Sequence, residues 1–260
     1  KIEQKASKIR RIFIFKTFLN LNINRIKIIF KFFYSIFYRV LYKNGLIVSF
    51  TGIDGAGKTS VKKYFLEKGD KYFIKGKMKE FYWRPFLLPA IAKLLGSKGQ
   101  EEKLDSSGKR ILKNNKTNKI KSYIKYFYYV SDFVFGKIKY FNQSHTGGLI
   151  LFDRYHFDNI IYPERFGFSI GKNVMRFFDK WIVPQPDIIF YLTADSDVLY
   201  NRKYEINIDE INAQKNIYEK EILKKGKIIT LNTNTTFEET IDEILFHCLN
   251  HMSNRGLNDR

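Results

Sequence analysis

The residues with the clearest chemical potential lie in one short segment, Gly52–Ser60, which reads GIDGAGKTS. The segment fits the pattern G-x-x-x-x-G-K-[ST] at every fixed position, through Gly52, Gly57, Lys58 and Thr59. The glycines of such a loop let backbone N–H groups point inward, and the positive end of the following helix adds to them. A loop of this kind holds a polyphosphate, so the sequence predicts a nucleotide site.

Side chains within this loop are expected to serve the phosphates and a metal ion. Lys58 would neutralise the β- and γ-phosphates of ATP, and the Thr59 hydroxyl would hold Mg²⁺. ATP and Mg²⁺ are therefore the predicted cofactors, and we expect the Lys58 side chain to face solvent in the empty loop. The predicted nucleotide contacts are Gly52, Asp54, Gly55, Ala56, Gly57, Lys58, Thr59 and Ser60.

The segments on either side of the loop must position it. The apolar run Leu46–Phe50 is typical of a buried parallel strand, because it is short and rich in branched or aromatic side chains. From Lys58 onward, apolar residues recur at spacings of three and four, at Val61, Tyr64 and Phe65, which predicts a helix. A strand that feeds a glycine loop and then a helix is the context that the motif requires.

The rest of the chain alternates apolar strands with helical segments. Further strands are predicted at Met78–Trp83, Leu149–Phe152, Ile188–Leu192 and Lys227–Leu231. Helices are predicted at Phe86–Leu95, Lys119–Asn142, Val174–Ile182, Ser196–Tyr204, Ile208–Leu223 and Phe237–His251. The lysine-rich residues 96–118 are predicted to form a mobile excursion. This alternation predicts an α/β fold with a doubly wound, five-stranded parallel sheet.

Polar residues beyond the ends of these strands are the remaining candidates. A doubly wound sheet binds its ligands outside the carboxyl ends of its strands. That rule singles out Asp54 in the loop, Arg84 after the second strand, and Asp153 with Arg154 after the third. After the fourth strand it singles out Arg202 with Lys203. We therefore expect these side chains to face one site.

Three motifs in this order resemble the thymidylate kinase family. They are the glycine loop with its acid, the sequence DRY at 153–155, and a PD pair at 186–187 before an apolar strand and a basic lid segment. The resemblance covers residues 45–250. It implies a fold of the P-loop nucleoside monophosphate kinase type and the transfer of a phosphoryl group from ATP to an acceptor.

The resemblance also implies roles for individual residues. Asp54 would face the acceptor, Arg84 would bind its phosphate, and Arg154 would clamp the acceptor or the transferring group. Asp153 would hold the metal or its water, and Arg202 would come from the lid. The implied catalytic residues are Lys58, Asp153, Arg154 and Arg202, the implied substrate contacts are Asp54, Arg84, Arg154 and Tyr155, and the implied metal ligands are Thr59 and Asp153.

Two segments depart from the family pattern. WRPF at 83–86 stands where the family has an arginine-glutamate-proline-glycine-glycine segment. HFDNIIYPER at 156–165 stands where a serine and an alanine-tyrosine-glutamine stretch helps to hold thymine. The first prediction for the acceptor is therefore a sugar or lipid-linked glycan, as in similar proteins associated with bacterial surface polysaccharide. The alternatives are a thymidylate (nucleoside monophosphate) kinase and, in another class, a non-catalytic ATP-binding regulatory protein.

The net charge of +20 is concentrated near the start of the chain. Residues 5–43 contain no acid and ten cations, which are Lys5, Lys8, Arg10, Arg11, Lys16, Arg25, Lys27, Lys31, Arg39 and Lys43. These cations alternate with Phe, Ile and Tyr, a pattern typical of an amphipathic helix on an anionic membrane surface. Packing on the kinase core or on a partner is the alternative, and nucleic acid is least favoured because the apolar content is high.

These features suggest an organisation and a location for the chain. We predict a basic helical extension at 1–44, a kinase domain at 45–250 and a C-terminal tail at 251–260. No run approaches the roughly 20 apolar residues that span a bilayer, and the single cysteine, Cys248, fits a reducing compartment. The expected location is cytoplasmic and peripheral on the inner membrane face, and a second copy of the chain is retained as a candidate partner.

Overall fold

The structure is a computed structural model of the chain and describes residues 27–34, 43–69, 71–73, 77–89, 119–202, 207–225 and 228–258. The chain divides into two units, Lys1–Lys43 and Asn44–Arg260. In the first unit, residues 27–34 form a helix in which every residue is exposed. Apart from this helix and residues 43–44, the predicted extension lies outside the described residues.

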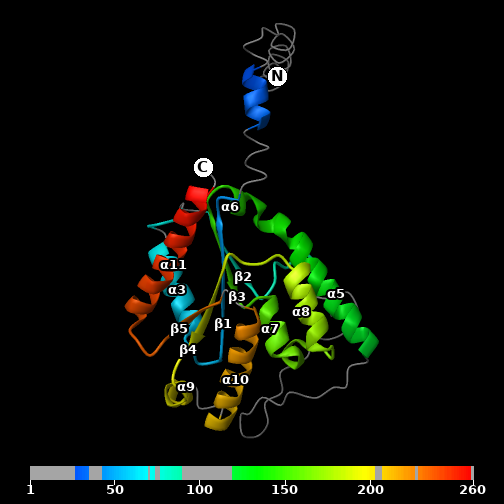
Figure 1. Cartoon of the computed structure of the whole chain (residues 1–260), viewed down its shortest axis with the longest axis vertical. Helices are drawn as coiled ribbons and strands as arrows, with labels where there is room; N and C mark the ends of the chain where they lie inside the picture. The colour runs from blue at the N-terminus through cyan, green and yellow to red at the C-terminus, as the bar shows by residue number, and fades with distance from the viewer. Residues whose placement is uncertain are drawn as a thin grey trace, which may run out of the picture. The chain divides into compact units, whose positions relative to one another are not determined.

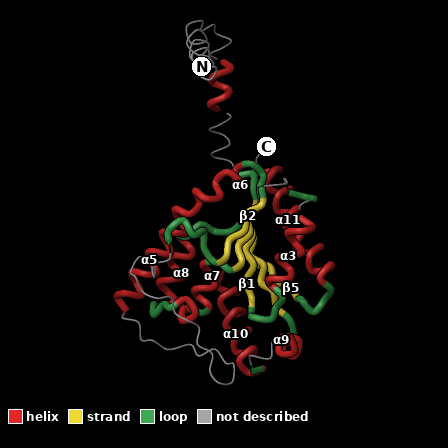
Figure 2. The backbone as a smooth tube through the Cα atoms, turned by 180° about the vertical axis from the view of Figure 1, so that it is seen from behind, coloured by secondary structure: helices red, strands yellow, loops and turns green. Residues whose placement is uncertain are grey.

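The second unit is built on a five-stranded parallel sheet (Figures 1 and 2). Its strands are β1 (Leu46–Gly52), β2 (Met78–Tyr82), β3 (Leu149–Asp153), β4 (Ile188–Thr193) and β5 (Ile228–Asn232), in the spatial order β2-β3-β1-β4-β5. The predicted sheet is thus confirmed. Because β1 lies between β3 and β4, the loop that follows β1 emerges where the connections change direction, which is where such sheets bind ligands.

The core lies on both faces of the three central strands. Every residue of β1 and β3 is buried, whereas β2 and β5 at the edges are partly exposed. Phe50 of β1 stacks on Phe190 of β4 at 5.6 Å, and Phe152 of β3 stacks on Phe81 of β2 at 5.1 Å. Burial on both faces explains why the central strands are rich in apolar residues without a regular alternation.

Helices cover both faces of the sheet. The α-helices are α3 (Lys58–Gly69), α5 (Lys119–Phe135), α6 (Phe141–His145), α7 (His156–Ile161), α8 (Lys172–Trp181), α9 (Ser196–Arg202), α10 (Ile208–Lys225) and α11 (Phe237–Asn258). Two 3₁₀ turns accompany them, η1 (Gly136–Tyr140) and η2 (Pro163–Phe166). In Figure 1, α3 and α11 lie on one side of the sheet and α5, α7 and α8 on the other. None of the described helices has the length and apolar character that a membrane crossing requires.

The helix predicted from Phe86 is wrong in its described part. Residues 86–89 are not helical, and Phe86 has a left-handed backbone with φ 54°. The Asp132 carboxylate on α5 accepts the N–H groups of Phe86 (3.1 Å) and Leu88 (2.7 Å), which holds this segment as a loop. The remainder of the predicted helix, and the predicted excursion at 96–118, lie outside the described residues.

Two other helices have different bounds from those predicted. The segment from Lys119 changes from α-helix to 3₁₀ helix at Gly136, where a side chain would collide with Pro85. The last helix reaches Asn258 and so includes most of the predicted tail. Arg255 anchors this extension, since it donates to the Gly45 carbonyl (2.9 Å) and pairs with Asp187 (2.9 Å).

Candidate functional site

The glycine loop after β1 has the backbone that a phosphate cradle needs. Gly52, Gly55 and Gly57 have φ values of 146°, 93° and 76°, which side-chain-bearing residues rarely adopt. A Cβ atom at Gly52 would also collide with the Leu192 carbonyl of β4. At Gly57, by contrast, a Cβ would meet only the Phe237 ring, 4.0 Å away. The loop is therefore fixed against the sheet on one side and open on the other.

The start of α3 offers donors for an anion. Within the described part of the chain, the N–H groups of Lys58, Thr59 and Ser60 donate no hydrogen bond, as is usual at a helix N-terminus. Thr59 and Ser60 are exposed, so their hydroxyl groups are accessible as well. Unpaired amide donors at the positive end of a helix fit a polyphosphate, and an exposed hydroxyl oxygen fits Mg²⁺.

Lys58 is buried rather than solvent-facing, so that expectation is wrong. Its Nζ donates to the carbonyl oxygens of Gly52 (2.8 Å) and Ile53 (2.6 Å) and lies 3.6 Å from the Asp54 carboxylate. Burial, assisted by the charge of Arg154, lowers the pKa of Lys58 to about 8, against the opposing effect of nearby acids. The ammonium group therefore lies within the empty loop, and the negative charge of a bound phosphate would attract it away from the two carbonyl oxygens.

Asp54 joins the two sides of the site. Its Oδ1 accepts a hydrogen bond from Nη2 of Arg154 at 2.6 Å, and its Oδ2 accepts one from Nη1 of Arg165 at 3.1 Å. Three residues predicted from the sequence, Lys58, Asp54 and Arg154, are thus brought together. Arg165, which comes from η2, was not predicted, because nothing in its segment indicates a 3₁₀ turn that faces the glycine loop.

A fully buried carboxylate, Asp158 on α7, holds Arg154 in place. Its Oδ1 accepts hydrogen bonds from Arg154 (3.2 Å), from the Thr51 hydroxyl (2.9 Å) and from the Tyr218 hydroxyl (3.2 Å). The Tyr218 hydroxyl also lies 3.2 Å from the Gly52 carbonyl. Asp158 therefore ties α7, α10 and the end of β1 to one arginine. Its position four residues after Arg154 is the signal from which this contact could have been inferred.

Arg154 itself sits on an unusual backbone. Its φ is 71°, and its N–H donates to the Phe50 carbonyl of β1 at 2.8 Å. Positive φ is uncommon for a non-glycine residue and persists where surrounding contacts hold it. Burial opposes the charge on Arg154, but Asp158, Tyr218 and Asp54 outweigh it and keep the pKa above its usual value. The guanidinium is therefore a permanent, preoriented cation.

Asp153, the predicted metal ligand, is buried at the end of β3. Its Oδ2 is 2.9 Å from Nζ of Lys62, which also lies 2.5 Å from the Glu80 carboxylate. Although burial lowers the pKa of Lys62, the hydrogen bonds to Glu80 and Asp153 outweigh it and raise that pKa. Lys62 was not predicted, although it stands one helical turn after Lys58. Its contact with Asp153 places a fixed positive charge beside the predicted Mg²⁺ position.

Arg84 does not join the Lys58, Asp54 and Arg154 group. Its side chain is 1% exposed, and its Nη1 lies 2.5 Å from Asp132 of α5 and donates to the Leu88 carbonyl at 3.0 Å. The guanidinium also lies over the rings of Phe86 (4.2 Å) and Tyr129 (4.7 Å). In this position Arg84 fastens the loop after β2 to α5.

Tyr155 and Arg202 also lie apart from that group. The Tyr155 ring is buried against Phe133 (4.9 Å), and its hydroxyl donates to the Pro184 carbonyl at 2.7 Å. Arg202 ends α9, where its two terminal nitrogens donate to the hydroxyl (3.1 Å) and carbonyl (2.8 Å) of Thr233. It is therefore anchored next to β5, and the residues that follow it, 203–206, lie outside the described residues.

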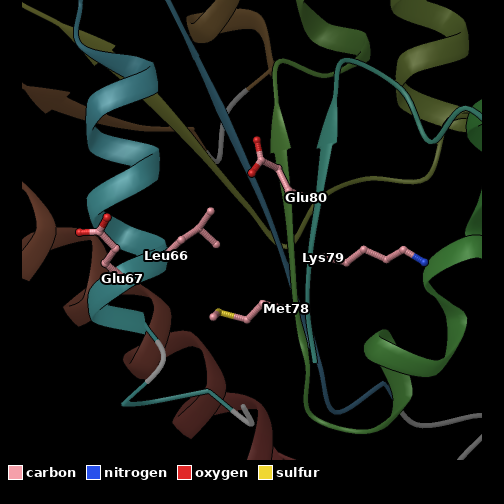
Figure 3. Close-up of a pocket in the computed structure, with 5 residues that line it drawn as sticks. All are labelled: Leu66, Glu67, Met78, Lys79 and Glu80. Carbon is pink, nitrogen blue, oxygen red and sulfur yellow. The ribbon is translucent and has the colours of Figure 1, made fainter. Parts of the chain in front are cut away.

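A shallow hollow of about 350 Å³ lies between α3 and β2 (Figure 3). It is lined by Leu66, Glu67, Met78, Lys79 and Glu80. None of the residues predicted for the site lines it, and its side chains do not converge on one point in the close-up. We assign it no function.

Comparison with known proteins agrees with the motifs. A family model described as thymidylate kinase matches residues 100–244. A solved thymidylate kinase from Ehrlichia chaffeensis is 14% identical, with a TM-score of 0.50, over 77% of this chain and 97% of that chain. One from Candida albicans is 17% identical, with a TM-score of 0.52, over 81% of this chain and 93% of that chain. No curated protein sequence matches the chain.

The solved structures, at these identities, support the fold alone, whereas the family model identifies the family. The glycine loop precedes the matched residues, so its assignment rests on its own sequence and geometry. The match includes Asp153, Arg154 and the helices around them, and it covers more than half of the 260 residues. The chain therefore belongs to the thymidylate kinase family and is a phosphotransferase of the nucleotide kinase class.

Proposed function

We propose that this chain transfers the γ-phosphoryl group of ATP, with Mg²⁺, to a nucleoside monophosphate, with thymidylate as the first acceptor to test. The observation that carries the proposal is the Asp54 carboxylate, which lies 3.6 Å from Lys58 on the nucleotide side and 2.6 Å from Arg154 on the acceptor side. Because Lys58 and Arg154 contact the same carboxylate, an ATP phosphate at Lys58 and an acceptor phosphate at Arg154 would lie close together. Direct transfer of the phosphoryl group requires this proximity.

The acceptor differs from the one first predicted. A sugar or lipid-linked glycan was inferred from what the chain lacks, namely the family's segments around thymine. The family match favours the nucleotide alternative instead. The non-catalytic alternative gains no support from the site, because a protein that only binds ATP has no need of an acceptor-side arginine held by a buried acid such as Asp158.

Each residue of the site can be assigned a role in phosphoryl transfer. ATP·Mg²⁺ supplies the phosphoryl group and neutralises charge on its β- and γ-oxygens. The N–H groups of Lys58, Thr59 and Ser60 would hold phosphate oxygens, and the Thr59 hydroxyl and Asp153 would hold the metal or its water. Arg154 would stabilise the charge that spreads over the transferring group. The protein thus contributes positioning and fixed charge, with no covalent step.

Two predicted residues keep a more distant role in this proposal. Arg84 would shape the acceptor side by fastening the loop after β2, since its charge is already paired with Asp132. Arg202 would reach the nucleotide only after it releases its two contacts with Thr233. Tyr155 would not contact the substrate, because its hydroxyl donates to the Pro184 carbonyl. It would instead support the neighbouring Arg154 from the core.

We also propose that residues 1–43 bind an anionic membrane surface, which would place the kinase peripherally on the inner face. The helix at 27–34 exposes large apolar side chains such as Phe30 (74%) and Phe33 (64%) together with Lys27 and Lys31. Exposed rings beside cations are the combination that binds an interface. The sequence pattern continues on both sides of this helix.

The acceptor is tested by following labelled γ-phosphate from ATP into a panel of nucleoside monophosphates and sugars. The proposal expects transfer to at least one nucleoside monophosphate, dependent on Mg²⁺, and none to the sugars. Efficient transfer to a sugar alone would restore the glycan prediction. Tight ATP binding without transfer to any acceptor would favour the non-catalytic alternative.

A further inference from the structure

Arg165 is placed for a role that the sequence assigned to Arg84. A guanidinium is a strong partner for a phosphate, but that of Arg84 is buried on Asp132. Arg165 reaches the same carboxylate as Arg154, at 3.1 Å from Asp54, while 31% of its side chain remains exposed. Two guanidinium groups from different elements thus converge on one anionic side chain.

The short turn that carries Arg165 is well fixed. The N–H of Phe168 donates to the Pro163 carbonyl at 2.8 Å, and Gly167 closes the turn with a φ of 68°. Phe166 stacks on Trp83 with a centroid distance of 4.7 Å, and its carbonyl accepts a hydrogen bond from Lys125 at 2.7 Å. These contacts join the turn to the loop after β2 and to α5, so the Arg165 backbone is preoriented.

We propose that Arg165 completes, beside Arg154, the binding site for the acceptor's phosphate, and that the Asp54 carboxylate occupies this site until the phosphate enters. The proposal rests on the proposed kinase function and names the residues that would select its substrate. A carboxylate and a phosphate present similar oxygen pairs to a guanidinium, so one can replace the other. The pair between Asp54 and Arg165 is partly exposed, a type that contributes little to stability and is easily exchanged.

The two partners in this exchange predict opposite effects. Arg165→Gln removes a donor for the phosphate, so it should weaken phosphate binding by about tenfold, the scale of one charge-assisted hydrogen bond. Asp54→Asn removes the competing anion, so it should strengthen phosphate binding by a similar factor while Asp158 still holds Arg154. A purely structural ion pair would make both variants weaken binding or leave it unchanged.

The test is calorimetry on the full chain with three probes at one salt concentration: thymidine 5′-monophosphate, thymidine and inorganic phosphate. Arg165→Gln should weaken the monophosphate and inorganic phosphate but leave thymidine unchanged. Arg165→Lys, which keeps the charge but loses the planar fork, should give an intermediate result. Lys137→Gln is the matched control, since it removes the same charge from the exposed part of η1.

The outcomes separate this inference from the proposed function. Unchanged phosphate affinity in Arg165→Gln, or weaker affinity in Asp54→Asn, would overturn the inference even if the chain transfers phosphate to thymidylate. Opposite effects of the two variants would support it even if transfer from ATP fails, because these measurements contain no ATP. An equal loss in Lys137→Gln would reduce the effect to general charge and would also overturn it.

Discussion

At the scale of single residues, the site is governed by charges that have been moved out of water. Lys58 is held over two carbonyl oxygens, and burial with Arg154 nearby lowers its pKa to about 8. A lysine in such a position destabilises the folded chain while it is charged. A bound polyphosphate would remove that penalty by supplying negative charge. Relief of the penalty would therefore add to the free energy of nucleotide binding.

The stored penalty predicts how stability responds to pH in Lys58→Met. Below pH 8 the lysine is charged in both states and its cost is fully present, at most about 3 kcal/mol from the difference between about 8 and 10.5. As pH rises from 8 to 10.5 the folded lysine is neutral while the unfolded one still binds a proton, so stability rises with pH and the cost disappears.

The variant should therefore gain most over the wild type at pH 7 and progressively less toward pH 10.5. Urea unfolding of the wild type and the variant at pH 7 and pH 10.5 measures the free-energy difference between them. The variant lacks the two hydrogen bonds of Lys58 at both pH values, so their loss largely cancels when the two differences are compared. A stability difference that is the same at pH 7 and pH 10.5 would contradict the lowered pKa of Lys58. Lys63→Met, from the same helix, serves as the control for an added apolar side chain.

The sequence predicted the residues of the site unevenly, for a physical reason. Lys58 and Asp54 lie in a motif whose backbone fixes their positions, and Arg154 follows directly on a strand end. Arg165 depends on the turn at η2, and its contact with Asp54 arises only when distant segments fold together. Arg84 was predicted to be a site residue from its place after β2, but it forms an ion pair with the buried Asp132 of α5. No local sequence pattern could indicate this pair.

At the scale of elements, the helix α5 fastens the loop after β2. One carboxylate, Asp132, accepts the amides of Phe86 and Leu88 and forms a buried ion pair with Arg84. Trp83 in the same loop stacks on Phe166. The loop after β2, the helix α5 and the turn η2 are thus held together as a unit.

This arrangement predicts a severe defect in Asp132→Ala. The substitution leaves the guanidinium of Arg84 buried without its carboxylate, which typically costs about 3–5 kcal/mol. Denaturant unfolding of the two proteins measures the cost. The double variant Arg84→Met with Asp132→Leu should recover most of it, because an apolar pair replaces the charges. A single variant as stable as the wild type would show that Asp132 does not hold this loop.

At the scale of the whole chain, the central strands were predictable because each is a short segment dominated by apolar residues. The helix α7 and the turn η2 were not predicted, since their six and four residues are too short for a periodic pattern. The loop at 86–89 looked helical because its side chains are apolar, but its amides are used by Asp132 instead. The conformation of residues 86–89 is therefore determined by tertiary hydrogen bonds and not by helix propensity.

The charge distribution gives a prediction for the N-terminal unit. Deletion of residues 1–43 removes eleven cations and one acid, a net +10 that is half of the total charge of +20, together with the exposed rings of the helix at 27–34. Residues 44–260 form a unit with its own core, so they should stay folded and lose binding to vesicles that contain anionic lipid. Vesicle sedimentation with rising salt measures this, since the Debye length of about 8 Å at physiological salt screens surface charge.

Two results would go against that account of residues 1–43. Binding to anionic vesicles that survives the deletion would place the membrane contact elsewhere. Unfolding of the shortened chain would assign the segment to the core of the kinase unit. Neutral vesicles serve as the control for apolar binding alone.

The central claim is that the glycine loop and the acceptor arginines form one phosphoryl transfer site. The most direct measurement is kcat/KM for transfer from ATP to thymidylate by the wild type and by Lys58→Ala, with folding checked by circular dichroism. The account predicts a wild-type value within the ordinary enzyme range of about 10⁴–10⁸ M⁻¹s⁻¹ and a loss of at least about a hundredfold in the variant. A folded variant that retains wild-type turnover would contradict it.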